Sequence, residues 1–189
     1  AASPRRRFVA NERLMLYDAD SMCVVTEGSV EVFAVRAVDG EMIGARRWLC
    51  TIATDSALFA IPSLEDGSLI FVTVAASDGE IETRDLADAR KDAAASDQAR
   101  AQLAALIDSW LLAVGGAVAR SDDTPITDLL VAGRTITLAA ARRAGATATV
   151  VWVRHLTGHS WYLGIGGVIA LRDSTSAFPL AGSAWMLSR

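Results

Sequence analysis

The first 76 residues contain short apolar or alternating runs, with glycine and aspartate in the segments that separate them. The runs are CVV at 23–25, SVEVFAV at 29–35, WLCTI at 48–52, ALFAI at 57–61 and LIFVTVAA at 69–76. Short runs at regular spacing, with turn residues between them, are typical of antiparallel β-sandwiches and jelly rolls. The sequence therefore predicts a jelly-roll-like β unit over residues 1–80.

One predicted hairpin lies inside this unit. Because side chains alternate along a strand, its first strand has a core face and a mixed face. The core face carries Val30, Val32 and Ala34, and the mixed face carries Ser29, Glu31, Phe33 and Val35. Asp39-Gly40 supplies residues that tolerate the positive φ of a tight turn. On the return strand, Trp48, Cys50 and Ile52 are expected to point the same way.

A helical segment follows the β unit. Asp85 can cap its start, and Gly115-Gly116 marks a weak point or an end. Its apolar residues recur at i, i+3, i+4, i+7, i+8 and i+11, which is one stripe of an amphipathic helix. The stripe consists of Leu103, Leu106, Ile107, Trp110, Leu111 and Val114. We interpret it as a packing face rather than a cofactor site.

Strand patterns return after a polar turn at 121–125. They are TATVVWVRHL at 147–156, SWYLGI at 160–165, GVIAL at 167–171 and a final AFPLAGSAWML at 177–187. Thr157-Gly158 is the predicted turn between the first two. The fold class predicted is mainly β with helices (α+β): a jelly-roll β-sandwich, a helical bridge at 81–133, and a second β unit at 134–189 that completes or pairs with the first.

Composition and charge narrow the classes of function. The chain has 189 residues, of which 52% are hydrophobic, so it can bury a full core. A net charge of −4 argues against a nucleic-acid partner, because phosphate-binding proteins carry clustered positive charge. The basic run at 5–7 is interpreted as a solvated tail rather than a membrane contact.

The cysteines and the lengths of the apolar runs argue against disulfide bonds and membrane spans. Cys23 and Cys50 lie in apolar strand-like runs and predict buried free thiols rather than a disulfide framework. No apolar run reaches the roughly 18 residues that a membrane span requires. We therefore expect a soluble segment that is not inserted in a membrane, whatever the parent protein contains.

No catalytic or metal-binding pattern emerges. His155 and His159 lie four apart across an expected strand turn, where their side chains need not converge, so both are assigned to the surface or rim. Ser160 is merely adjacent to a histidine, without the geometry of a triad. The glycines of 164–167 fit a bend or bulge between strands, and Lys91 lacks a phosphate-binding loop. We predict no catalytic residue, no metal and no cofactor.

The hairpin also carries a family resemblance. GSVEVFAVRAVDGEMIGARRWLCTIATDSALFAIP, residues 28–62, resembles the N-terminal cyclic-nucleotide-binding-like domain of NHLM-type bacteriocin exporters, which are ABC transporters. VVWVRHLTGHSWYLG at 150–164, and the later FPL with Trp185, look like the second β segment of that family. The resemblance implies a fragment whose transmembrane and ATP-binding domains lie elsewhere in the same transporter.

This resemblance implies a non-catalytic regulatory or accessory domain at the cytoplasmic face of the bacterial inner membrane. Its partners would be those two transporter domains and a substrate leader peptide, and it could form a homodimer. Trp161 or Tyr162 could serve a docking face, although core packing is an equal alternative. A strand edge could also accept an extended peptide.

Two alternatives remain open from the residues. A small-ligand sensor would need an anion pocket, for which Arg46, Arg47 and Arg154 are the candidate guanidiniums. The segment at 57–62 lacks the glycine, glutamate and following arginine of a cyclic nucleotide phosphate cassette, which argues against cyclic nucleotides. A cupin-type enzyme would require a bound metal.

Overall fold

The chain forms two compact units, residues 1–113 and 114–189, which are described separately. The computed structural model describes residues 4–14, 16, 18–38, 41–60, 69–118, 126–146, 150–164, 167–172, 177–180 and 185–188. Among these, no helix is both long enough and apolar enough to cross a membrane.

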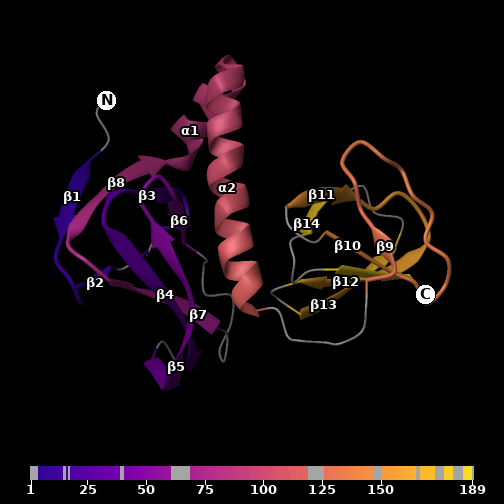
Figure 1. The fold of residues 1–189 in the computed structure, drawn as a ribbon, viewed down its shortest axis with the longest axis horizontal. Coiled ribbons are helices and arrows are strands. Elements are labelled where there is room, and N and C mark those ends of the chain that lie inside the picture. The colour runs from indigo at the N-terminus through magenta and orange to yellow at the C-terminus, as the bar shows by residue number, and fades with distance from the viewer. Residues whose placement is uncertain are drawn as a thin grey trace. The chain divides into compact units, whose positions relative to one another are not determined.

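The first unit consists of eight strands followed by two helices (Figure 1). The strands are β1 (Arg5–Phe8), β2 (Arg13–Leu14), β3 (Ser21–Glu27), β4 (Ser29–Val38), β5 (Glu41–Ala53), β6 (Ala57–Phe59), β7 (Leu69–Ala75) and β8 (Gly79–Asp85). The helices are α1 (Leu86–Ala95) and α2 (Asp97–Val118), the second of which runs across the boundary between the units.

The strand order of the first unit is that of a jelly roll. One four-stranded sheet has the order β1-β8-β3-β6 and the other β2-β7-β4-β5. Four antiparallel strand pairs follow one another along a single long hairpin, which folds into the two sheets. They are β1·β8, β2·β7, β3·β6 and β4·β5. This arrangement confirms the predicted antiparallel jelly roll.

The structure confirms the predicted strands and adds three. The apolar runs at 23–25, 29–35, 48–52, 57–61 and 69–76 correspond to β3, β4, β5, β6 and β7. Strands β1, β2 and β8 were not predicted, because their sequences RRRF, RL and GEIETRD are dominated by charged residues. They become strands through pairing with their neighbours rather than through an apolar pattern of their own.

The predicted direction of the Trp48 side chain on the return strand is wrong. Opposite consecutive residues Val32 and Phe33, strand β5 places Cys50 and Trp48, so Leu49 is an extra residue in the ladder. This bulge reverses the alternation of inward and outward side chains along β5. Cys50 is therefore buried in the core, whereas Trp48 is 54% exposed. The predicted turn residues Asp39-Gly40 lie outside the described residues, although the strands on either side of them do pair.

The predicted core face of β4 is confirmed, since Val30, Val32 and Ala34 are all buried. Both cysteines are buried free thiols, as expected. Burial raises the pKa of the Cys50 thiol to about 11, so it stays protonated at neutral pH. Because the two thiols are the only cysteines of the chain, their protection reports on the roll and not on the second unit.

The helical segment is two helices rather than one. Asp85 caps α1, as predicted, and its carboxylate accepts a hydrogen bond from the Asp88 amide at 3.0 Å. Ser96 has extended backbone angles and separates α1 from α2. Gly115-Gly116 does not end the helix, which continues to Val118.

The apolar stripe of α2 is a packing face, as predicted. Trp110 is 5% exposed and contacts the rings of Phe59 and Phe71, with centroid distances of 6.3 and 5.9 Å. Leu103 and Leu106 pack against a cluster of Met22, Val24 and Ala57, which come from β3 and β6. The helix α2 therefore packs against both sheets of the roll through apolar and aromatic side chains.

The second unit is built from β9 (Asp128–Leu129), β10 (Arg143–Gly145), β11 (Val151–Arg154), β12 (His159–Gly164), β13 (Gly167–Arg172), β14 (Ala177–Leu180) and β15 (Trp185–Ser188). Five of them form a sheet with the order β13-β12-β15-β10-β9, and β11 pairs with β14. A core cluster of Leu130, Ala144 and Tyr162 supports this sheet. Within the described residues, every sheet takes its strands from one unit.

The turn predicted at Thr157-Gly158 joins strands of different sheets. Strand β11 pairs with β14, whereas β12 pairs with β13 and β15. A local hairpin was predicted because only the short linker is visible in the sequence. Gly164 and Gly167 instead pair with each other in the β12–β13 hairpin. The three-part division at 1–80, 81–133 and 134–189 stays a prediction.

Candidate functional site

The candidate guanidiniums of the predicted anion pocket lie in different units. Arg46 and Arg47 are exposed on β5 of the roll, and Arg154 is exposed on β11 of the second unit. Arg47 pairs in register with Ala34, on the face that leads into the roll. The three residues are therefore not assembled into one site within either unit.

The aromatic residues proposed for docking are not the most exposed ones. Tyr162 is buried in the core of the second unit, and burial raises its pKa. Trp161 is half-buried. Among the side chains that the structure describes, the aromatic residues with large exposed areas are Trp48 at 54% and Trp152 at 53%. Strict alternation along the return strand places Trp48 in the core, so the sequence pattern did not indicate its exposure.

Only one of the two histidines lies where it was predicted. His159 is exposed at the start of β12, as predicted for the surface or rim, but His155 is buried. Among the described residues, no group of three or more histidine, cysteine, aspartate or glutamate side chains could hold a metal.

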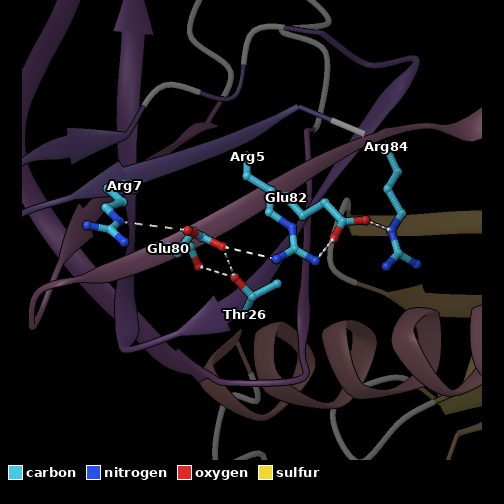
Figure 2. Close-up of polar contacts among 6 residues, drawn as sticks. All are labelled: Arg5, Arg7, Thr26, Glu80, Glu82 and Arg84. Carbon is cyan, nitrogen blue, oxygen red and sulfur yellow. Dashed lines mark hydrogen bonds and ion pairs between the residues drawn. The ribbon is translucent and has the colours of Figure 1, made fainter. Parts of the chain in front are cut away.

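The basic run at 5–7 is an edge strand and not a solvated tail. Strand β1 pairs with β8 over four residues, which aligns Arg5 with Glu82 and Arg7 with Glu80. Figure 2 shows Arg5 between the two glutamates, at 3.6 Å from Glu80 and 3.3 Å from Glu82. The sequence could not show this, because the pairing joins segments about 75 residues apart.

Two further residues, Arg84 of β8 and Thr26 of β3, contact these glutamates. Arg84 donates to the Glu82 carboxylate at 2.5 Å, and the Thr26 hydroxyl donates to the Glu80 carboxylate at 3.3 Å (Figure 2). Glu82 is only 8% exposed. Its hydrogen bond to Arg84, together with the charges of Arg84 and Arg5, lowers the pKa of the Glu82 carboxyl. We interpret these ion pairs and hydrogen bonds, which we call the ladder, as interactions that stabilise the pairing of β1 with β8.

Glu82 is expected to make the roll sensitive to acid. Because its folded pKa is lowered, its contribution is present above the ordinary glutamate pKa, about 4.3, and is lost as the pH falls through the folded value. Urea unfolding of Glu82→Gln should therefore show a deficit at pH 6 that shrinks toward pH 3. Glu41→Gln, at an exposed position on β5, is the control. A deficit that is constant with pH would contradict this role.

The edge strand β5 carries five exposed side chains, which lie on both faces of the strand and which we call the hairpin patch: Met42, Ile43, Arg46, Arg47 and Trp48. β5 ends the order β2-β7-β4-β5, and all five side chains are exposed. Such an edge leaves backbone N–H and C=O groups without a strand partner. Within the described residues, no strand pairs with this edge.

A cleft is present on the other sheet, between α1, α2 and the strands β3 and β8. It has a volume of about 320 Å³. Its lining includes Met22, Leu103 and Leu106, together with charged residues of α1. This volume lies at the lower end of the range typical of small-molecule sites.

Comparisons with known proteins identify no family. No family matches the sequence, and no curated protein is similar to it. Three of the solved structures that it matches are CprK C200S, FixK2 from Bradyrhizobium japonicum and the catabolite activator protein of Thermus thermophilus. The chain spans about half the length of these structures.

The three matches are distant. CprK C200S is 11% identical with a TM-score of 0.42, covering 56% of this chain and 49% of the other. For FixK2 the values are 14%, 0.40, 57% and 51%, and for the Thermus thermophilus protein they are 22%, 0.40, 56% and 48%. The fold assignment given above rests on the strand order of the roll.

Proposed function

We propose that this chain is a non-catalytic binding domain of a bacterial ABC-type peptide exporter, and that it docks a substrate leader peptide on the hairpin patch. The exporter assignment is supported by the resemblance of residues 28–62 and 150–164 to NHLM-type exporters. The docking assignment is carried by one observation: Trp48 is 54% exposed on an edge strand, displaced from the core by a bulge.

The composition of the hairpin patch is that of an interaction hot spot. Tryptophan and arginine are enriched where alanine substitutions weaken protein–protein binding most. Trp48 follows Arg46 and Arg47 directly, and Met42 and Ile43 add exposed apolar surface at 39% and 42%. The patch therefore favours a peptide that combines apolar side chains with carboxylates.

The backbone of β5 offers a second means of binding. An extended peptide can add to a sheet edge through main-chain hydrogen bonds, while the side chains provide specificity. The bulge at Leu49 and the register shift near Gly44 interrupt this edge. Such irregularities discourage pairing of one copy with another, so the side chains of the patch are expected to decide the partner.

The decisive experiment is titration of the chain with a fluorescently labelled leader peptide of the nitrile hydratase-like type. Trp48→Ser should weaken binding by about tenfold or more, since loss of a hot-spot side chain costs about 2 kcal/mol. Trp152→Ser is the matched control, because Trp152 is 53% exposed but lies in the second unit. It should leave the dissociation constant unchanged.

Other outcomes separate the alternatives. Equal binding by both variants would reject docking at the hairpin patch. A cyclic nucleotide that binds the folded chain should stabilise it by roughly 2.7 kcal/mol at about 100 times the dissociation constant, and should therefore raise the melting temperature. If it did so, the small-ligand sensor would replace this proposal.

A further inference from the structure

The segment that contains β9 and leads to β10 carries a cluster of exposed apolar side chains, and we call residues 126–142 the β9 loop. Four of the ten large apolar side chains that are exposed among the described residues lie in it: Ile126, Leu129, Val131 and Ile136. Single exposed apolar residues are ordinary on protein surfaces, whereas an apolar patch marks an interaction site. The β9 loop is therefore a candidate binding surface of the second unit.

Hydrogen bonds and an ion pair hold the two ends of the β9 loop together. The Thr127 amide donates to the Arg143 carbonyl at 3.0 Å, and the Arg143 amide donates to the Thr127 hydroxyl at 2.9 Å. The Arg142 guanidinium donates to both oxygens of the Asp128 carboxylate, at 2.9 and 3.3 Å. The loop is thus closed at its base.

Two leucines attach the β9 loop to the core and leave its other apolar side chains outside. Leu130 is buried in the core cluster of the second unit, and Leu138 packs against that cluster. Leu129 and Val131, on either side of Leu130, are 58% and 48% exposed, and Ile136 is 39% exposed. The folded and anchored loop therefore presents these three side chains to its surroundings.

The charge of the second unit suits an anionic partner. Residues 114–189 contain seven arginines, four aspartates and neither lysine nor glutamate, a net charge of +3, whereas residues 1–113 carry −7. Asp128 is the only carboxylate of the β9 loop, and Arg142 neutralises it. The Arg134 amide donates to the Val131 carbonyl at 3.3 Å, so a turn brings an exposed arginine next to an exposed apolar residue.

We propose that the β9 loop binds the surface of an anionic lipid bilayer, with Leu129, Val131 and Ile136 entering the boundary between headgroups and acyl chains and Arg134 contacting lipid phosphates. Aliphatic side chains gain free energy on leaving water, and an arginine near an anionic membrane adds electrostatic attraction. A bilayer offers an apolar layer directly beneath negative charge, which is the combination that the loop matches. The hairpin patch lies in the first unit, so this proposal and leader-peptide docking can fail independently.

Sedimentation of the whole chain with lipid vesicles tests the apolar contact. The chain should bind vesicles of phosphatidylcholine mixed with phosphatidylglycerol, and should bind pure phosphatidylcholine more weakly. Val131→Ser combined with Ile136→Ser should weaken binding to the mixed vesicles about tenfold. The matched control is Val9→Ser combined with Ile43→Ser, at positions 61% and 42% exposed in the first unit. Equal losses in the two double variants, or equal binding to both vesicle types, would overturn the proposal.

The electrostatic contact is tested at Arg134. Arg134→Gln should weaken binding to the mixed vesicles about fivefold, and this loss should shrink at high salt. Binding to pure phosphatidylcholine should not change. Arg90→Gln, at an exposed position on α1, is the control. An Arg134 variant that binds the mixed vesicles as well as the Arg90 variant does would refute the phosphate contact.

A fluorescent label on the loop distinguishes a bilayer from an acidic protein. Because Cys23 and Cys50 are buried, a polarity-sensitive thiol reagent should label Val131→Cys selectively. Its emission should shift to the blue on mixed vesicles, whereas the same label at Thr51→Cys, exposed on β5, should not shift. An unshifted label at residue 131, with binding to soluble polyglutamate that depends on Arg134, would assign the loop to an acidic protein partner instead.

Discussion

Replacing Gly28 with alanine is expected to destabilise the roll far more than the same replacement at Gly44. Both glycines have left-handed backbone angles, with φ of 81° and 79°. An alanine at either position carries a strain of about 1–2 kcal/mol. A Cβ at Gly44 would meet no atom within 4 Å, whereas one at Gly28 would overlap the carbonyl oxygen of Asp78.

The overlap at Gly28 cannot be relieved by a rotating side chain, because the neighbour is backbone. Gly28 separates β3 from β4, where Ser29 donates its amide hydrogen to the Ser77 hydroxyl at 3.1 Å. Moving this turn disturbs the junction of both sheets. Overpacking typically adds about 1–3 kcal/mol, so the loss at Gly28 should exceed that at Gly44 by this amount.

The equal φ values make the pair a controlled comparison. Unfolding of the roll can be followed in urea through the reactivity of Cys23 and Cys50, since both thiols are buried in the first unit. Gly28→Ala should expose them at a lower urea concentration than Gly44→Ala. Equal midpoints would show that backbone strain alone, and not the contact with Asp78, decides the cost.

Truncation of Trp110 should have the second large effect. The side chain is 5% exposed and contacts Phe59 of the first sheet and Phe71 of the second. Removing a buried aromatic side chain costs about 3–5 kcal/mol. Aromatic pairs with an edge-to-face geometry, such as the 70° interplanar angle to Phe71, add to this cost.

Trp110→Ala is therefore expected to lower the free energy of unfolding of the first unit and to loosen α2 from the roll. The thiol assay measures the first effect, and hydrogen exchange of the α2 amides measures the second. Trp110→Phe should retain much of the packing. Trp48→Ala is the exposed control and should change stability little, which would also show that the hairpin patch is available for binding rather than needed for folding. Similar losses in both tryptophan variants would contradict this division.

The sequence by itself determined the architecture wherever burial follows a local period. The core face of β4, with Val30 and Val32, and the packing stripe of α2, with Trp110, were both readable, because side-chain direction repeats every two residues in a strand and about every 3.6 in a helix. Asp85 as a helix cap was also readable, since capping involves only neighbouring residues.

Only the tertiary structure decided the features that depend on distant pairing. The bulge at Leu49 places Trp48 outside the core, although the period-two pattern predicts the opposite. The run of arginines becomes β1 because Glu80 and Glu82 lie opposite it on β8. The cleft unites Met22 with Leu103, about 80 residues away. A local pattern carries no information about which distant strand or helix completes it, so both candidate surfaces became visible only in the folded chain.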